Sequence, residues 1–434
     1  MLKVNISWSM LGLALPAIVA AFTIPELIGR LGNERFGFLG LVWALTGFGG
    51  IFDLGVGRAA VFFISDRLGR LDVKGVLQIY DAAKKITLAA GIFGGCLLLL
   101  ATLLNVQSYI SYSLVTEEEV FFSMLIVAVM IPMQAMITTL RGVNEAFQEF
   151  KFISFVRILN GVVTFVGPVL VSLWTTNLLM LILPLTVAKL FTLALSKLLA
   201  TNAIRKLDMS GLNATEASRD TYIQMIRFGG WATVSTILSP FMTQADRFII
   251  GVYISAAAVG VYVLPMEVIS QSLLLIGGIT TVMYPFLSRK FSENFNAGLS
   301  IFSNYSKLLN VLFLAIYIPL FFLIPYLMEA WIEGTSSESI LIAQVLCCGA
   351  LFNSLTGIKY SMIQGMGRAD ITAKIHLIEL PLYIILVFIL VINFGLIGAA
   401  IAWSARMLLD LTLMTAAFWR LAVEVQKREN LVIC

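Results

Sequence analysis

The feature that most constrains this chain is a series of apolar runs, each about twenty residues long, that recurs along its whole length. A helix of that length crosses a bilayer, and its backbone groups satisfy one another without water. With 59% hydrophobic and only 12% charged residues, the chain has too little polar surface for a soluble domain of 434 residues. We therefore predict an all-α polytopic membrane protein with twelve spans, near residues 6–28, 36–63, 86–105, 120–140, 155–173, 178–196, 228–251, 259–287, 308–328, 340–358, 376–394 and 396–418.

The basic residues predict how these helices are oriented. If the N-terminus is cytoplasmic, 23 of the 29 Lys and Arg residues fall on the cytoplasmic side, and only Arg30 and Arg35 fall outside. Cytoplasmic loops of membrane proteins are enriched in Lys and Arg. The asymmetry predicts that both termini are cytoplasmic. The net charge of +4 then reflects topology, and we expect no nucleic-acid partner.

The two halves of the chain resemble each other at a constant offset. Trp8 corresponds to Trp231, and the pairs Gly142 with Gly365 and Lys151 with Lys374 have the same separation of 223 residues. A repeated offset of this kind indicates a duplicated unit. We predict two parallel six-helix lobes around a central cavity, with a lobe over 1–200, a cytoplasmic linker over 201–222 and a lobe over 223–434.

A short basic motif after the second run, "DRLGR" at residues 66–70, is similar to a loop of major facilitator porters. That family's motif needs a glycine where this chain has Phe62, and usually a basic residue where it has Leu71. A further polar stretch at 71–85 also makes the loop too long. We interpret the motif as an ordinary basic cytoplasmic loop, and keep a facilitator porter as a minor alternative.

Four other segments resemble a different family over roughly residues 5–420. The stretches "RLGNERFGFLGLVWALTGFGGIFDLGVGRA" and "QADRFIIGVYISAAAVGVYVLP" look like the starts of the two lobes of polysaccharide and O-antigen flippases. The segments "RGVNEAFQEF" and "QGMGRADI" are similar to the polar turns that follow the fourth and tenth helices of these flippases. The resemblance implies export of a polyprenyl-diphosphate-linked oligosaccharide across the bacterial cytoplasmic membrane, with a polysaccharide polymerase and chain-length proteins as partners. It implies no enzymatic activity, cofactor or metal.

Charged residues inside predicted spans are functional candidates, because charge is costly in hydrocarbon. Lys189 is the clearest, since it lies near the middle of its span with no acid within four residues. A cationic cavity for a diphosphate would use Lys189, Arg247, Arg58, Arg406 and Arg30. Coupling or charge partners would be Glu26, Asp53, Asp246, Glu267 and Asp410.

Each of these residues also has a structural interpretation. Arg406 and Asp410, four residues apart, can neutralise each other on one helix. Arg58 can extend toward the cytoplasmic interface, and Glu267 can pair with Arg247. His376 and Glu379 fit a charge pair at the membrane boundary better than a proton site.

Two other functions remain open from the sequence. A cation-coupled multidrug extruder of the same superfamily would place acids in its cavity, and that alternative rests on Glu26, Asp53, Asp246 and Glu267. A membrane enzyme would be expected to have a large external loop or a His–acid motif, whereas this chain has one His and short predicted external loops.

Overall fold

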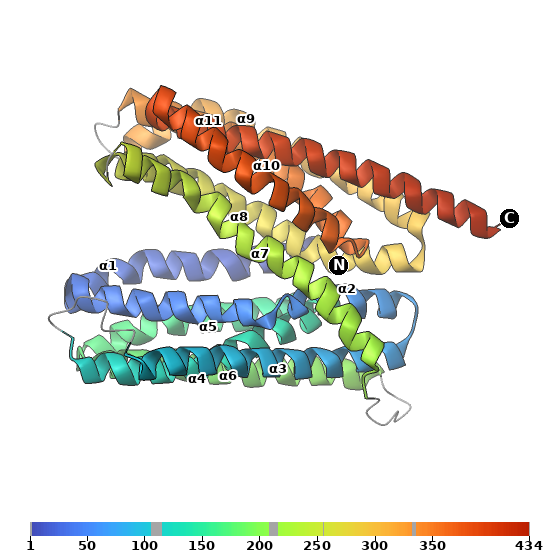
Figure 1. The fold of residues 1–434 in the computed structure, drawn as a ribbon, viewed down its shortest axis with the longest axis horizontal. Coiled ribbons are helices and arrows are strands. Elements are labelled where there is room, and N and C mark those ends of the chain that lie inside the picture. Colours follow the sequence, from blue (N-terminus) through green and yellow to red (C-terminus); the bar gives the residue numbers. More distant parts are fainter. Residues whose placement is uncertain (1, 106–114, 208–215, 255, 332–335, 434) are drawn as a thin grey trace. The chain divides into compact units, whose positions relative to one another are not determined.

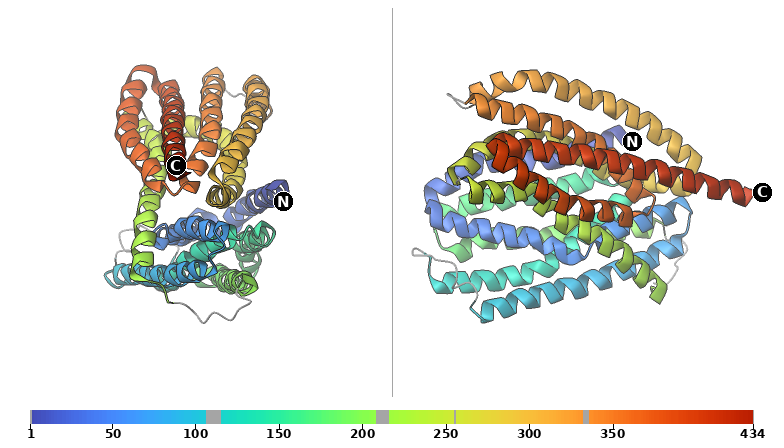
Figure 2. Two further views of the ribbon diagram at one scale, coloured as in Figure 1. Left: turned by 90° about the vertical axis from the view of Figure 1, so that its right-hand side faces the viewer. Right: turned by 45° about the horizontal axis from the view of Figure 1, so that its top comes forward.

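A computed structural model describes residues 2–105, 115–207, 216–254, 256–331 and 336–433. All regular structure in these ranges is helical, as predicted (Figure 1). The chain forms two compact units, Met1–Thr233 and Val234–Cys434, which we describe separately. Within each unit the helices run side by side (Figure 2).

The N-terminal unit contains the first six predicted spans. Its elements are α1 (Leu2–Phe48), the 3-10 helix η1 (Gly49–Asp53), α2 (Val56–Gly69), α3 (Val73–Leu103), α4 (Glu117–Ala146), α5 (Phe150–Ser172), α6 (Leu178–Leu207) and the first part of α7 (Arg219–Tyr253). Gly32 has a left-handed φ of 74° and divides α1 into two spans. This break lies where the sequence predicts an external turn.

The second predicted span, 36–63, is interrupted near its middle. The helix tightens into η1 and restarts as α2 after Gly55, whose φ is 67°. The carboxylate of Asp53 accepts hydrogen bonds from the backbone N–H groups of Gly55 (2.8 Å) and Gly57 (3.2 Å). Asp53 therefore satisfies backbone donors at the start of α2 that would otherwise lack partners.

The C-terminal unit contains the rest of α7, together with α8 (Ala256–Glu293), α9 (Phe295–Trp331), α10 (Ser337–Gly365) and α11 (Ala369–Ile433). Gly395, with φ 61°, separates α11 into two helices at the predicted turn. Ten stretches of the described residues are long and apolar enough to span a membrane. With the break at Gly395 and with α7, they account for the twelve predicted helices.

Helices α2 and α4 approach each other backbone to backbone. A β-carbon added to Gly142 would lie 2.3 Å from the carbonyl oxygen of Gly57, so no side chain fits there. Small residues allow such close packing in membranes, where lipid supplies little hydrophobic force between helices. Nearby, the hydroxyls of Thr87 and Thr139 form a buried 2.7 Å hydrogen bond that joins α3 to α4.

Helix α7 contributes to both units. Its residues up to Thr233 belong to the N-terminal unit, where the ring of Phe228 stacks on that of Phe62 of α2 at 5.2 Å. Gly229 lies against Gly55, with the Gly229 carbonyl oxygen 2.2 Å from a β-carbon placed on Gly55. From Val234 onward the same helix belongs to the C-terminal unit. The lobe boundaries and the linker over 201–222 remain predictions.

Candidate functional site

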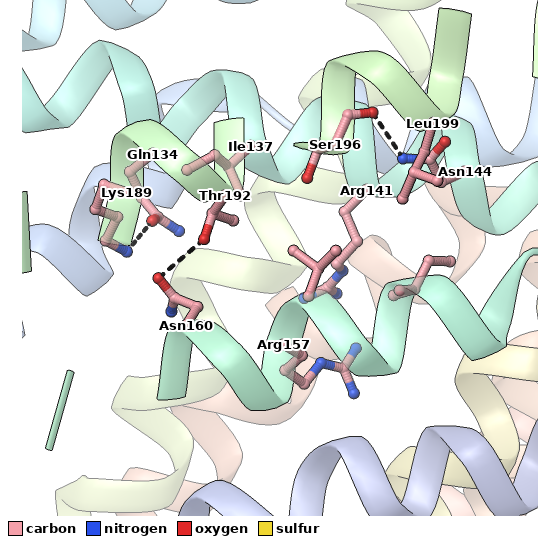
Figure 3. Close-up of a pocket in the computed structure, with 12 residues that line it drawn as sticks. Gln134, Ile137, Arg141, Asn144, Arg157, Asn160, Lys189, Thr192, Ser196 and Leu199 are labelled. Atoms are coloured by element: carbon pink, nitrogen blue, oxygen red, sulfur yellow. Dashed lines mark hydrogen bonds between the residues drawn. The ribbon is translucent and has the colours of Figure 1, made fainter. Parts of the chain in front are cut away.

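Helices α4, α5 and α6 enclose a polar cavity of about 140 Å³ within the N-terminal unit (Figure 3). Lys189, the clearest candidate from the sequence, lines it from α6. The cavity is lined by Gln134, Ile137, Arg141, Asn144, Ile153, Val156, Arg157, Asn160, Lys189, Thr192, Ser196 and Leu199. Three of these residues are cations, and among the described residues no acid lines the cavity.

The Lys189 ammonium group has a neutral partner. It donates a hydrogen bond to the side-chain oxygen of Gln134 on α4 (Figure 3). Within the described part of the chain Lys189 forms no ion pair. An amide oxygen orients the ammonium group but leaves its positive charge uncompensated. An acid on another helix would compensate this charge, but none of the described residues does so.

Two arginines supply the other positive charges. Arg157 of α5 makes no hydrogen bond or ion pair with the described residues. Arg141 of α4 is ion-paired through Nε with the Glu145 carboxylate at 3.0 Å. The guanidinium groups of Arg141 and Arg157 are close enough to repel each other. The cavity therefore carries excess positive charge, which an anion would offset.

Amides and hydroxyls occupy the rest of the polar surface. The hydroxyl of Thr192 donates to the Asn160 side-chain oxygen at 3.3 Å, and the Asn144 amide donates to the Ser196 carbonyl at 3.1 Å. Figure 3 shows Lys189 at one end of the cavity and Asn144 at the other, with the arginines between them. The cavity therefore offers neutral donors and acceptors next to its cations.

Sequence reasoning missed both arginines, because it assigned them to cytoplasmic segments by charge counting. The helical spacing of the polar residues in these segments would have revealed the two arginines. Lys189, Thr192 and Ser196 have the spacing of one helix face, and Gln134 and Arg141 are two turns apart. Polar residues at helical spacing along neighbouring apolar helices indicate a shared polar interior.

The other predicted residues of the N-terminal unit lie outside this cavity. Arg30 forms an exposed 2.5 Å ion pair with Glu26, one turn earlier on α1. Arg58 of α2 does not line the cavity. Asp53 caps α2, as described above. None of these residues shares the cavity with Lys189.

In the C-terminal unit the predicted residues form local contacts. Arg247 and Glu267 form the predicted pair, at 3.3 Å. The carboxylate of Asp246 accepts a 2.7 Å hydrogen bond from the Tyr262 hydroxyl. Neither Asp246 nor Tyr262 is exposed to solvent.

The expected ion pair between Arg406 and Asp410 is not formed. Arg406 instead donates to the Met242 carbonyl at 3.0 Å and lies over the ring of Tyr383. Asp410 faces a different set of groups. It lies with His376 and Glu379, and the ligand-type atoms of the three residues are all within 4.8 Å of one another. Among the described residues this is the one such group of three that could hold a metal ion.

Comparison with known proteins identifies similar chains. The family model described as "Polysaccharide biosynthesis protein" matches residues 2–291. A Shigella flexneri protein, provisionally named an O-antigen transporter, is 27% identical over 423 residues, covering 96% of this chain and 97% of its own.

Solved structures with a similar fold are MATE transporters. One in the straight conformation is 14% identical, with a TM-score of 0.80 over 98% of this chain and 96% of its own. A Vibrio cholerae MATE transporter is 15% identical, with a TM-score of 0.79 over 99% of this chain and 97% of its own. At these identities the likeness concerns the fold alone.

Proposed function

The chain belongs to the polysaccharide biosynthesis protein family, and from that premise we propose that it is a flippase for a polyprenyl-diphosphate-linked oligosaccharide. The substrate would be the repeat unit of O-antigen or of another surface polysaccharide. The protein would move it outward across the bacterial cytoplasmic membrane by alternating access, as a transporter and not an enzyme. The name of the Shigella flexneri relative agrees with this proposal.

The observation that carries the proposal is a cavity lined by three cations and, among the described residues, by no acid. A diphosphate presents several charged acceptor oxygens. A guanidinium group such as that of Arg157 can bind two of these oxygens through two parallel hydrogen bonds. An ammonium group such as that of Lys189 binds them as a point charge. Seven residues of α4, about 10 Å of helix, separate Gln134 beside Lys189 from Arg141. The positive charge is therefore spread along the cavity, which suits a ligand that moves through it.

The neutral groups suit the sugar part of the same substrate. Sugar hydroxyls both donate and accept hydrogen bonds, as do the amides of Asn144 and Asn160. The polyprenyl tail needs no polar site, because it can remain in the bilayer. An inside-negative membrane potential of 100 mV would favour outward movement of the anion by about 2.3 kcal/mol per charge.

The same cavity disfavours the multidrug alternative. Many drugs carried by a cation-coupled extruder are cationic, and Lys189 and the two arginines would repel them. The fold shared with MATE transporters leaves this question open, because folds host many functions. The charge of the cavity, more than the fold, supports an anionic substrate.

A reconstituted assay tests the proposed function. In vesicles that contain the purified protein, a lipid-linked oligosaccharide should move from one leaflet of the membrane to the other. A sugar-binding lectin added on the side of that second leaflet should then bind it. Arg157→Ala should slow this movement about tenfold, as loss of one charged hydrogen bond of about 1.5 kcal/mol predicts. Arg157→Lys should retain part of the activity, because the charge remains. Movement of a cationic drug with no movement of the oligosaccharide would overturn the proposal.

The orientation follows from the distribution of basic residues, and we propose that both termini are cytoplasmic in the bacterial inner membrane. A polysaccharide polymerase and chain-length proteins would be its protein partners. A cysteine introduced at Ser336 should react with an impermeant reagent in intact cells. A cysteine at Ser218 should react only after permeabilisation, and its reaction in intact cells would reverse the orientation.

A further inference from the structure

The C-terminal unit contains a buried pair of acids that the proposed function does not use. Glu379 lies in the first helix of α11, before Gly395, and Asp410 lies in the second. Glu379 is 1% exposed and Asp410 is 8% exposed. A carboxylate oxygen of each acid lies within 4.8 Å of a ring nitrogen of His376. The break at Gly395 thus brings together two acids that are 31 positions apart in the sequence.

Neither acid has a cationic partner in direct contact. No Lys or Arg of the described residues forms an ion pair with Glu379 or Asp410. One oxygen of each, Oε1 of Glu379 and Oδ1 of Asp410, is buried without a hydrogen-bond donor. Two carboxylates this close in a low-dielectric interior repel each other strongly, and each also loses its hydration.

The neighbouring helices do not supply the missing positive charge. On α7 and α8, Asp246 and Tyr262 form their own hydrogen bond, which adds a further acid to this interior. Arg406, one turn before Asp410 on α11, donates to the Met242 carbonyl; it attracts both acids from a distance but forms no ion pair with either. On α10, the ring of Tyr360 stacks on that of His376 at 6.1 Å. The group therefore contains more acids than permanent cations.

We propose that Glu379 and Asp410 share one exchangeable proton, which enters and leaves through His376. The carboxyl group that carries the proton would donate a hydrogen bond to the other, ionised carboxylate, so that the pair holds a single negative charge. His376 is half-buried while both acids are buried, which makes it the member closest to solvent. When protonated, it would balance the charge that remains.

The ligand geometry favours a proton over a metal ion. The group offers three ligand atoms. Calcium takes six to eight oxygens and magnesium an octahedral set. Zinc can bind three protein ligands and a water, but its sites are mostly built from His and Cys, whereas two of the three ligand atoms here are carboxylate oxygens. The backbone carbonyls within these helices are already used by helical hydrogen bonds. The inference does not depend on the proposed oligosaccharide substrate, since it concerns a proton bound to the ligand-free protein.

Infrared spectroscopy of the purified protein tests this proposal. At neutral pH the wild type should show the carbonyl band of a protonated carboxylic acid, and the band should shift in D2O as the proton exchanges. Glu379→Gln and Asp410→Asn should each shift or weaken the band, because the remaining carboxyl group no longer shares its proton with a second carboxylate. Glu329→Gln, which changes an exposed acid of α9, is the matched control and should leave the band intact.

Further outcomes decide between the alternatives. His376→Gln should keep the band but slow its shift in D2O, and exchange as fast as in the wild type would remove His376 from the path. Absence of the band, or an unchanged band in both single variants, would overturn the shared proton. Loss of the wild-type band on adding sodium ions would assign the pair to a metal cation and also overturn it. The amide substitutions mimic a protonated acid in shape, so size-exclusion profiles should match those of the wild type.

Discussion

Replacing Lys189 with alanine is expected to reduce export of the oligosaccharide by roughly ten- to a hundredfold, because a charged hydrogen bond to the ligand contributes about 1.5–3 kcal/mol. The amount of folded protein should not fall. The partner of Lys189 is the neutral Gln134, so the substitution leaves no buried acid without its counter-ion. Export and the yield of folded membrane protein should be measured on the same samples.

Two matched variants sharpen this test. Lys189→Arg keeps the charge and should retain part of the export. Lys197→Ala removes an exposed Lys from the same helix, outside the cavity, and should behave as the wild type. Normal export by an abundant Lys189→Ala protein would remove this residue from the mechanism. A parallel fall in yield would indicate that Lys189 supports folding.

Gly142→Ala is expected to be strongly destabilising, although it adds only one methyl group to α4. The added β-carbon would lie 2.3 Å from a backbone oxygen of Gly57, and a backbone cannot turn aside as a side chain can. Helices α2 and α4 would have to separate, at a cost of about 3 kcal/mol, near the upper end for overpacked interiors. The ratio of folded to unfolded protein should fall about a hundredfold.

The control for this change is another helical glycine. A β-carbon on Gly40 of α1 would meet nothing within 4 Å. Gly40→Ala should therefore keep or slightly raise stability, because alanine is the better helix former. Thermal unfolding of the detergent-solubilised proteins, followed by size-exclusion chromatography, measures both. Equal stability of the two variants would show that the α2–α4 contact is not close-packed in the membrane.

The sequence predicted the twelve helices well because the length of an apolar run is a strong physical signal. It did not predict the interruption between Gly49 and Gly55, because glycines and a single acid also occur within helices that are not interrupted. The interruption depends on contacts: Asp53 binds backbone donors, and Gly55 lies against Gly229. Glycines in a run show where such a break is possible but not whether it occurs.

The site was predicted less completely. Lys189 was identified because it is isolated in an apolar run, whereas Arg157 was counted as a topological charge. Spacing alone also suggested the wrong partner for Arg406. Positions four apart lie on one face of a helix, but a long side chain can turn instead toward a neighbouring carbonyl, here that of Met242. Partner choice depends on tertiary packing, which a single sequence does not contain.

The division of α7 between the units affects how this protein can be cut into pieces. If the gene is split between α6 and α7, the second polypeptide carries residues 219–233, which pack within the first unit. The first polypeptide then lacks the helix segment that bears Phe228, and Phe62 loses its stacking partner. A cut at Thr233 avoids this mismatch but severs a helix. Neither half is therefore a self-sufficient module, and co-expressed halves should assemble only when the second half donates that segment to the first.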